Sequence, residues 1–379
     1  MRIDVRPDLL QWARERSGID DETFYRRFPN FIKWHRREMQ PTLNQLEHFA
    51  QITHTPIGYL FLSEPPVEEI PIPDFRTIGN KRIKRPTPDL LDTIYICQQR
   101  QEWYRDFALS TKEEPLRFVG SATVRSKIKE TAENIRIALG FDIEERRTTP
   151  TWTDALRRFI DQADMLGVLV MVNGVVGNNN YRKLDPDEFR GFALSDAFAP
   201  LIFINGADTK AAQMFTLAHE LAHIWLGQSA LSDVAPTTTP TNEVELWCNS
   251  VAAEVLVPLE VFQRELRNDE NLRESLERLA RRFKVSTLVI LRRMFDAGRF
   301  TRKRFWENYK EELLRLLAVP KSTGGDFYLT QGARVGKRFA RALVTSALEG
   351  QTLHRDAFRL LGFSKLATFR ELGRALGVI

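Results

Sequence analysis

Residues 215–226 read FTLAHELAHIWL, with two histidines four positions apart on either side of a glutamate. In a helix, residues at this spacing lie on one face, with their Cβ atoms about 5–6 Å apart. His219 and His223 can then bind one metal ion, with Glu220 beside the ion rather than on it. The apolar residues around them predict a buried helix. The competing interpretation is two core histidines flanking a glutamate in an ion pair.

Short runs rich in β-branched and aromatic residues precede this helix, bounded by Gly, Asn, Asp and Pro as strands are. We expect Asn178–Asn180 to lie in a loop and 123–139 and 151–166 to be helical. The sequence therefore predicts an α+β fold, mainly α, with a small sheet beside the helix that carries the H-E-x-x-H motif. The runs predicted to be strands are 167–172, 190–194 and 200–204.

A third protein ligand is needed for a catalytic zinc ion. Residues 242–258, NEVELWCNSVAAEVLVP, have a helical pattern and offer Glu243, Glu245 and Glu254 as candidates. Glu245 and Glu254 are nine residues apart, which at about 100° per residue puts them on opposite faces, so one helix cannot direct both to the same ion. Cys248 falls among the packing residues, which disfavours it as a ligand.

The two motifs together, FTLAHELAHIWLG and E-x-x-C-N-x-x-A-A-E-x-L-x-P, resemble the ImmA/IrrE family of zinc metallo-endopeptidases. DEFRGFALSDAFAPLIFIN and IPIPDFRT, upstream of them, resemble the same family. The resemblance extends from about residue 40 to 300. It implies a zincin-like peptidase domain with Zn²⁺ as cofactor. It also makes Glu245 the third ligand, with Asn249 one turn further on the same side as a supporting residue.

With zinc on these three residues, the charge of the ion implies a mechanism, and the resemblance implies a substrate. Zinc acidifies a water molecule and polarises the scissile carbonyl, and Glu220 accepts the proton of that water and passes it to the leaving amine. The expected substrate is a helix-turn-helix repressor or an antitoxin. A gene beside that of this chain is one candidate source of this substrate. Its cleavage would switch on a stress, mobile-element or phage-defence response. Two alternatives stay open: a DNA-binding regulator or toxin–antitoxin component whose zinc domain acts by binding, and a zinc hydrolase of a small amide.

The N-terminal part resembles a phage-repressor-like helix-turn-helix domain, carried by PTLNQLEHFAQITHTPIGYLF. Only residues 30–38 are left for its recognition helix, about two turns. A degenerate domain that packs against the rest of the chain therefore competes with a DNA-binding one. We expect this domain over 1–62, and a Pro-rich strap and linking helix over 63–115.

The zinc peptidase domain is expected over 116–258, and the chain after it is basic. Residues 259–379 contain 25 Lys and Arg against 14 Asp and Glu. A helix ending near Phe283 and another starting near Ser286 predict a second helix-turn-helix within 259–320, followed by a helical module over 321–379. A helical support with solvated arginines is the competing interpretation. The candidate contacts with double-stranded DNA are Lys284, Arg292, Arg293, Arg302, Lys303 and Arg304.

Composition excludes several classes of protein. The chain has 379 residues, of which 43% are hydrophobic and 28% charged, so we expect two or three globular domains rather than a disordered or fibrous chain. Its two cysteines cannot form a disulfide scaffold. We find neither a signal peptide nor a stretch apolar enough to span a bilayer. The sequence thus predicts a cytoplasmic protein without a membrane partner.

Overall fold

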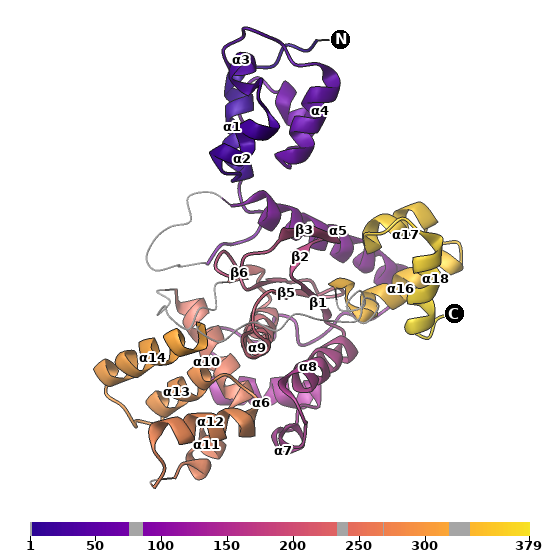
Figure 1. The fold of residues 1–379 in the computed structure, drawn as a ribbon. Helices are drawn as coiled ribbons and strands as arrows, with labels where there is room; N and C mark the ends of the chain where they lie inside the picture. The colour runs from indigo at the N-terminus through magenta and orange to yellow at the C-terminus, as the bar shows by residue number, and fades with distance from the viewer. Residues whose placement is uncertain (1, 76–85, 233–241, 268, 318–333) are drawn as a thin grey trace. The chain divides into compact units, whose positions relative to one another are not determined.

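The computed structural model describes residues 2–75, 86–232, 242–267, 269–317 and 334–379, which divide into two compact units (Figure 1). The first unit takes its residues from Met1–Pro71 and Ile83–Ile94, and the second from Ile72–Arg82 and Tyr95–Ile379. Three expected features fall partly outside the described residues. These are positions 76–85 of the Pro-rich strap, 233–241 before the second motif, and 318–333, where the C-terminal module was expected to begin.

The first unit is a small bundle of helices around an aromatic core that includes Phe24, Phe28 and Phe49. The stretch expected to hold a shortened recognition helix forms α3, which has only five residues and turns Phe31 and Trp34 into that core. Whether this unit is a DNA-binding helix-turn-helix stays a prediction. Its elements are α1 (Pro7–Ser17), α2 (Asp21–Arg27), α3 (Phe31–His35), α4 (Leu43–Ile52) and the 3₁₀ helix η1 (Ile57–Phe61), and α5 (Pro88–Ser110) contributes residues to both units.

A four-stranded sheet with the order β1-β5-β4-β6 forms the centre of the second unit. β1 pairs in parallel with β5, whereas β4 is antiparallel to both β5 and β6. The side chains of β4, β5 and β6 are buried on both faces, as expected for strands covered by helices. The strands of this sheet are β1 (Leu169–Asn173), β4 (Gly191–Leu194), β5 (Leu201–Asn205) and β6 (Ala230–Ser232).

Three local features differ from the prediction. Asn179 and Asn180 are not in a loop but begin β3 (Asn179–Lys183), which pairs with β2 (Val175–Val176) in a separate hairpin. This polar, mostly exposed strand lacks the alternation of apolar residues that would have revealed it. β6 was not expected, because three residues are too few to show a period. The helix expected from 123 begins only at Ile128, since a turn closed by the Ser126 N–H to the Thr123 carbonyl precedes it.

The helix α9 (Lys210–Leu226) packs on β4 and β5 and against α8 and α10, which makes it the central helix of this unit. Around it lie helices that share one apolar core with the sheet. The helices of this part are α6 (Ile128–Leu139), α7 (Ile143–Arg147), α8 (Trp152–Leu166), α10 (Glu243–Leu256), α11 (Leu259–Glu265), α12 (Leu272–Phe283), α13 (Thr287–Asp296) and α14 (Arg302–Leu317).

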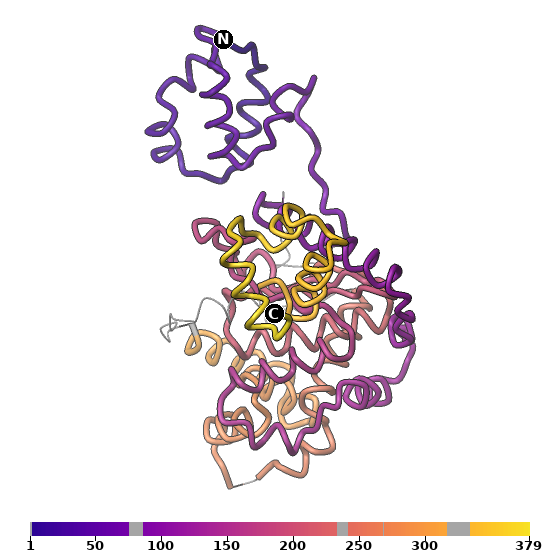
Figure 2. Tube along the Cα trace, turned by 90° about the vertical axis from the view of Figure 1, so that its right-hand side faces the viewer, coloured from indigo at the N-terminus to yellow at the C-terminus, as the bar shows by residue number. Residues whose placement is uncertain are grey.

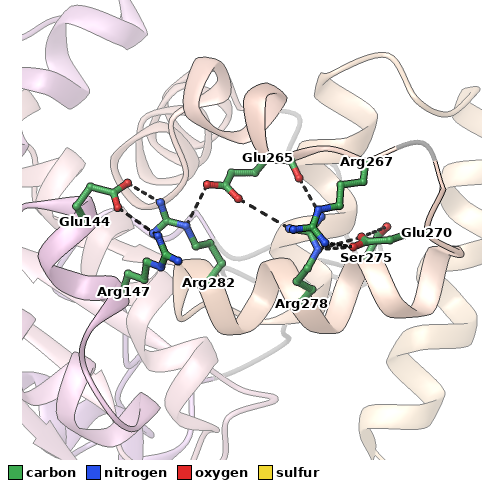
Figure 3. Close-up of polar contacts among 8 residues, drawn as sticks. All are labelled: Glu144, Arg147, Glu265, Arg267, Glu270, Ser275, Arg278 and Arg282. Carbon is green, nitrogen blue, oxygen red and sulfur yellow. Dashed lines mark hydrogen bonds and ion pairs between the residues drawn. The ribbon is translucent and has the colours of Figure 1, made fainter.

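The helix α12 ends at Phe283 and α13 follows after a cap at Ser286, at the positions the sequence predicted. Ion pairs fix α12 to its neighbours (Figure 3). Arg282 contacts Glu144 of α7 and Glu265 of α11. Arg278 binds Glu270, with its Nε 2.7 Å from a carboxylate oxygen. Since these pairs form a network, they hold the arginines in place more firmly than isolated surface pairs would.

Three C-terminal helices pack on the β1 side of the sheet (Figures 1 and 2). The buried guanidinium of Arg100 on α5 donates to the carbonyl of Leu360, and α16 contacts both β1 and α8. No helix among the described residues combines the length and the apolar character needed to cross a lipid bilayer. The C-terminal helices are α16 (Lys337–Leu348), α17 (His354–Leu361) and α18 (Leu366–Ala375).

Candidate metal centre

The helix α9 carries the two histidines of the first motif. Thr209 caps its N-terminus by accepting a hydrogen bond from the Ala212 N–H, and Gly227 ends it in a left-handed conformation with a φ of 69°. Nearly every residue from Gln213 to Leu226 is buried, as the apolar sequence predicted. His219 and His223 therefore lie one turn apart on a face that is closed to solvent.

The helix α10 brings a carboxylate to these histidines. The side chain of Asn242 caps its N-terminus by accepting from the Val244 N–H at 2.8 Å. Glu245 lies in the first turn, where its side chain is only 2% exposed. Because α10 packs along α9, this carboxylate reaches the two imidazoles.

The three side chains bring two nitrogens and two carboxylate oxygens close together. The Nε2 atoms of His219 and His223 are 3.1 Å apart. Glu245 Oε1 lies 3.1 Å from His223 Nε2, and Glu245 Oε2 lies 3.3 Å from His219 Nε2. Ligands about 2.0–2.2 Å from a tetrahedral zinc ion are separated by roughly 3.3–3.6 Å, so these distances are close to those that zinc requires. Among the described residues, no other group of three or more potential ligands lies this close together.

Two polar side chains orient the ligands. Asn249 Oδ1 lies 3.0 Å from Nδ1 of His219, so a proton on Nδ1 leaves Nε2 of that ring free to bind a metal. Ser232 of β6 places its hydroxyl 3.3 Å from His223 Nε2 and donates to Glu245 Oε1 at 3.5 Å. Asn249 was named from the sequence as a supporting residue. Ser232 was missed because no motif or spacing marks it.

Glu220 is fully buried on α9, and neither of its carboxylate oxygens has a hydrogen-bond partner among the described residues. Burial and the Glu245 carboxylate raise the pKa of Glu220, whereas the charge of His219 and the nearby Ser232 hydroxyl lower it, and the net result is a pKa of about 8. Gly191 of β4 faces this carboxylate. A Cβ atom there would lie 2.5 Å from Thr216 Cγ2 and 3.4 Å from Glu220 Oε1, so glycine leaves room for both side chains.

The electrostatics of the pocket favour a cation. Burial raises the pKa of Glu245, but the charge of His219 and hydrogen bonds from both histidines outweigh it and hold that pKa at about 2. Burial lowers the pKa of His219, yet the Glu245 carboxylate raises it above its ordinary value. The pKa of His223 is lowered by burial, so the positive charge that balances Glu245 falls on His219 when no metal is bound. The nitrogen and oxygen donors fit zinc, which binds both types.

The other candidate ligands lie elsewhere. Glu243 is exposed at the start of α10. Glu254 lies on the opposite face from Glu245, as the helical geometry predicted for this pair, and forms an ion pair of 2.7 Å with Arg293 of α13. Cys248 is buried in the apolar core and does not belong to the cluster of ligand atoms.

The six basic residues proposed for DNA contacts differ in exposure. Lys284 is buried with its Nζ 5.5 Å from the centre of the Trp152 ring. Arg293 is buried in its ion pair with Glu254, so neither of these two side chains offers a surface to phosphate. Arg292 is half-exposed and pairs with Asp296. Arg302, Lys303 and Arg304 are exposed at the start of α14.

Comparison with known protein families agrees with this geometry. Residues 163–295 match the family model of the peptidase family M78, described as the IrrE N-terminal-like domain. The matched segment contains the H-E-x-x-H helix and Glu245, and it supports both a metallopeptidase and the resemblance to the ImmA/IrrE family. Residues 335–375, which include α16–α18, match a model described as a domain of unknown function (DUF8813). No curated protein matches the chain.

Proposed function

We propose that this chain is a zinc-dependent endopeptidase in which His219, His223 and Glu245 hold the ion and Glu220 transfers the proton. The observation that carries the proposal is the set of short distances, 3.1–3.3 Å, between the histidine nitrogens and the two oxygens of Glu245, in a pocket that also buries an unpartnered carboxylate. Burying two neighbouring carboxylates beside two imidazoles costs much less free energy when a cation lies among them. The match to a peptidase family favours hydrolysis over simple metal storage.

Zinc supplies a Lewis acid that polarises the scissile carbonyl and lowers the pKa of an adjacent water molecule. Glu220 accepts a proton from the attacking water as its oxygen bonds to the carbonyl carbon, and holds that proton on a carboxylate oxygen. It then gives the proton to the amide nitrogen as the carbon–nitrogen bond breaks.

The supporting residues keep the ligands in position. Asn249 fixes the ring of His219, and Ser232 contributes a hydroxyl to the carboxylate of Glu245. Side chains of this kind hold ligands in the geometry that the metal needs, which affects both affinity and rate.

For the substrate we propose a helix-turn-helix repressor or an antitoxin. A protein substrate is supported by the match to a peptidase family, and the narrower choice rests on the resemblance to the ImmA/IrrE family. We also keep the interpretation of 1–62 and 259–320 as helix-turn-helix domains as a proposal, with double-stranded DNA as a possible partner. The exposed residues that would contact its phosphates are Arg292, Arg302, Lys303 and Arg304.

The test compares the parent protein with Glu220→Gln, using a small repressor or antitoxin encoded beside the gene as substrate and intact mass as the readout. Glu220→Gln should keep the fold and its zinc, because Glu220 is not a ligand, yet cleave at least roughly 100-fold more slowly. Glu243→Gln, the same change at an exposed position on α10, is the matched control and should cleave like the parent. Cleavage by Glu220→Gln at the parent rate would refute the mechanism.

A further inference from the structure

The candidate centre is closed to solvent. His219, Glu220 and His223 are 0% exposed, and the side chain of Glu245 is 2% exposed. A peptide bond must nevertheless come within hydrogen-bond distance of Glu220 for the proposed reaction. Some part of the chain that covers the site must therefore leave before a substrate can enter.

The residues Ile72–Phe75, here called the edge segment, lie along β6. The Leu231 N–H donates to the Pro73 carbonyl at 2.9 Å, and the Phe75 N–H donates to the Leu231 carbonyl at 3.0 Å. Asp74 thereby forms a parallel bridge with Leu231. β6 is the last strand in the order β1-β5-β4-β6, so the edge segment occupies the backbone groups of a sheet edge. A free edge of this kind pairs readily with any extended chain.

This edge runs beside the candidate centre. Ser232, the residue after Leu231, places its hydroxyl 3.3 Å from His223 Nε2. The ring of Phe75 stacks on the imidazole of His223, with centroids 6.2 Å apart and an angle of 9° between the planes. An extended segment paired with Leu231 therefore places a ring beside and parallel to the imidazole of a proposed zinc ligand.

The edge segment is suited to an extended conformation. Pro71 and Pro73 bias the residues before them toward extended backbone. Ile72 is buried, whereas Pro73 and Asp74 are exposed. Two backbone hydrogen bonds and one ring contact are small individual contributions. Their effect is large in the intact chain because the segment is covalently attached, which gives it an effective concentration in the millimolar range.

We propose that the β6 edge is the site where an extended segment of the protein substrate pairs, and that Ile72–Phe75 occupies this site in the resting chain. The proposal rests on the zinc-peptidase function put forward above. The substrate segment replaces the edge segment on the N–H and C=O of Leu231, a mode of recognition that reads backbone and alternate side chains. The stacking of Phe75 on His223 selects an aromatic side chain in the substrate at the corresponding position.

The experiment measures the binding of a peptide to the full-length, zinc-loaded protein carrying Glu220→Gln, so that cleavage plays no part. The probe is a fluorescently labelled, C-terminally amidated peptide with the sequence of residues 69–75, EIPIPDF. In this background Phe75→Ala removes the ring, and Phe75→Pro removes both the ring and the N–H that binds Leu231. Phe75→Tyr keeps both, and Tyr181→Ala, an aromatic side chain that is 99% exposed, is the matched control.

We expect the peptide to bind roughly tenfold tighter or more to Phe75→Pro than to the background protein, because the attached competitor has been weakened. Phe75→Ala should fall between them, and Phe75→Tyr and Tyr181→Ala should match the background protein. Hydrogen exchange at the Leu231 amide should be faster in Phe75→Pro and slow again when the peptide is added. Equal peptide affinity in all variants, binding to none of them, or an unchanged Leu231 exchange rate would each overturn the proposal.

These readouts are independent of catalysis. If the peptide and exchange results are as expected but the parent protein cleaves no substrate, the proposal that Ile72–Phe75 occupies the β6 edge is supported and the proposed peptidase function is wrong. If the parent cleaves a repressor while Leu231 exchange is the same in every variant, the function stands and the proposal about the edge segment fails.

Discussion

Asn249 shows how single residues outside the ligand set control the centre. Its Oδ1 accepts the Nδ1 proton of His219 at 3.0 Å, which fixes the tautomer that presents Nε2 to a metal. We expect Asn249→Leu, which fills the space without an acceptor, to lower the affinity for zinc roughly 10–100-fold and to leave the fold intact. Competition with a fluorescent chelator measures this affinity.

Ser250→Ala is the control for that variant. Ser250 is the next residue on α10, and its hydroxyl donates to the Leu246 carbonyl of the same helix. Its loss should leave the affinity for zinc unchanged. An affinity in Asn249→Leu equal to that of the parent would show that the contact with His219 has no role in binding the metal.

The candidate site could be predicted from the sequence only where local spacing determines geometry. His219, Glu220 and His223 belong to one helix, so the helical period alone puts them together. Glu245 comes from another helix. The helical period showed only that Glu245 and Glu254 lie on opposite faces of that helix, and the resemblance to a family was needed to choose between them. Ser232 and Phe75 reach the centre through strand pairing, for which a single sequence gives no signal.

At the scale of elements, Asp164 joins the end of α8 to α16 and β1. Its carboxylate accepts from the backbone N–H of Arg338 at 3.1 Å and of Val170 at 3.5 Å. Burial raises the pKa of Asp164 from 3.8 to about 6, and Asp161 raises it too, while these two hydrogen bonds and Lys337 lower it. The folded protein thus keeps a proton on this group that the unfolded chain releases near pH 3.8.

The sign of the pH dependence follows from that difference. The contribution of Asp164 to the free energy of unfolding is greatest below the unfolded pKa and declines until the pH passes about 6. The side chain in Asp164→Asn cannot ionise, so this variant's free energy of unfolding does not show this decline as the pH rises. Relative to the parent, we expect the variant to gain up to about 3 kcal/mol between about pH 4 and pH 7. Urea unfolding at both pH values measures it, and a difference between the proteins that does not change with pH would contradict the assignment.

Long helices with a regular spacing of apolar residues could be predicted from the sequence, whereas short or polar strands could not. The helices α8, α9, α10 and α12 carry apolar periodicity, and the sequence marks the ends of α8 and α9 with Gly167 and Gly227 and that of α10 with Pro258. β6 has three residues and owes its existence to pairing with β4, a tertiary contact. The polar hairpin of β2 and β3 likewise depends on its partner strand rather than on its own pattern.

At the scale of the whole molecule, Gly336 marks the point where the C-terminal helices join the sheet. Its φ is 81°, and a Cβ atom there would lie 2.9 Å from the backbone oxygen of Val170 in β1. Gly350 has a similar φ of 76° but no atom within 4 Å of the added Cβ. Alanine at either position incurs backbone strain, and only Gly336→Ala adds a clash with a strand that cannot move easily.

We therefore expect Gly336→Ala to speed hydrogen exchange throughout α16–α18, whereas Gly350→Ala should change exchange only near the substitution. We expect Gly350→Ala to lower the free energy of unfolding by about 1–2 kcal/mol, and Gly336→Ala to lower it by roughly 1–3 kcal/mol more than that. Equal effects of the two substitutions would mean that the close approach to Val170 does not hold these helices on the sheet.

The organisation of the whole chain was the least accessible to prediction. Proline-rich and charged stretches indicated where segments change character, but which faces meet depends on contacts between distant residues. The buried Arg100 that binds the Leu360 carbonyl is one such contact, and 260 positions separate the two residues. No local pattern in the sequence predicts a pairing over that distance.

Elemental analysis of the purified chain shows whether one zinc ion is held by two imidazoles of α9 and a carboxylate of α10. We expect one zinc per chain in the parent and in Glu243→Ala, which changes an exposed glutamate on the same helix, and almost none in His223→Ala or Glu245→Ala. Zinc retained at one per chain in both ligand variants, or absent from the parent after loading, would contradict it.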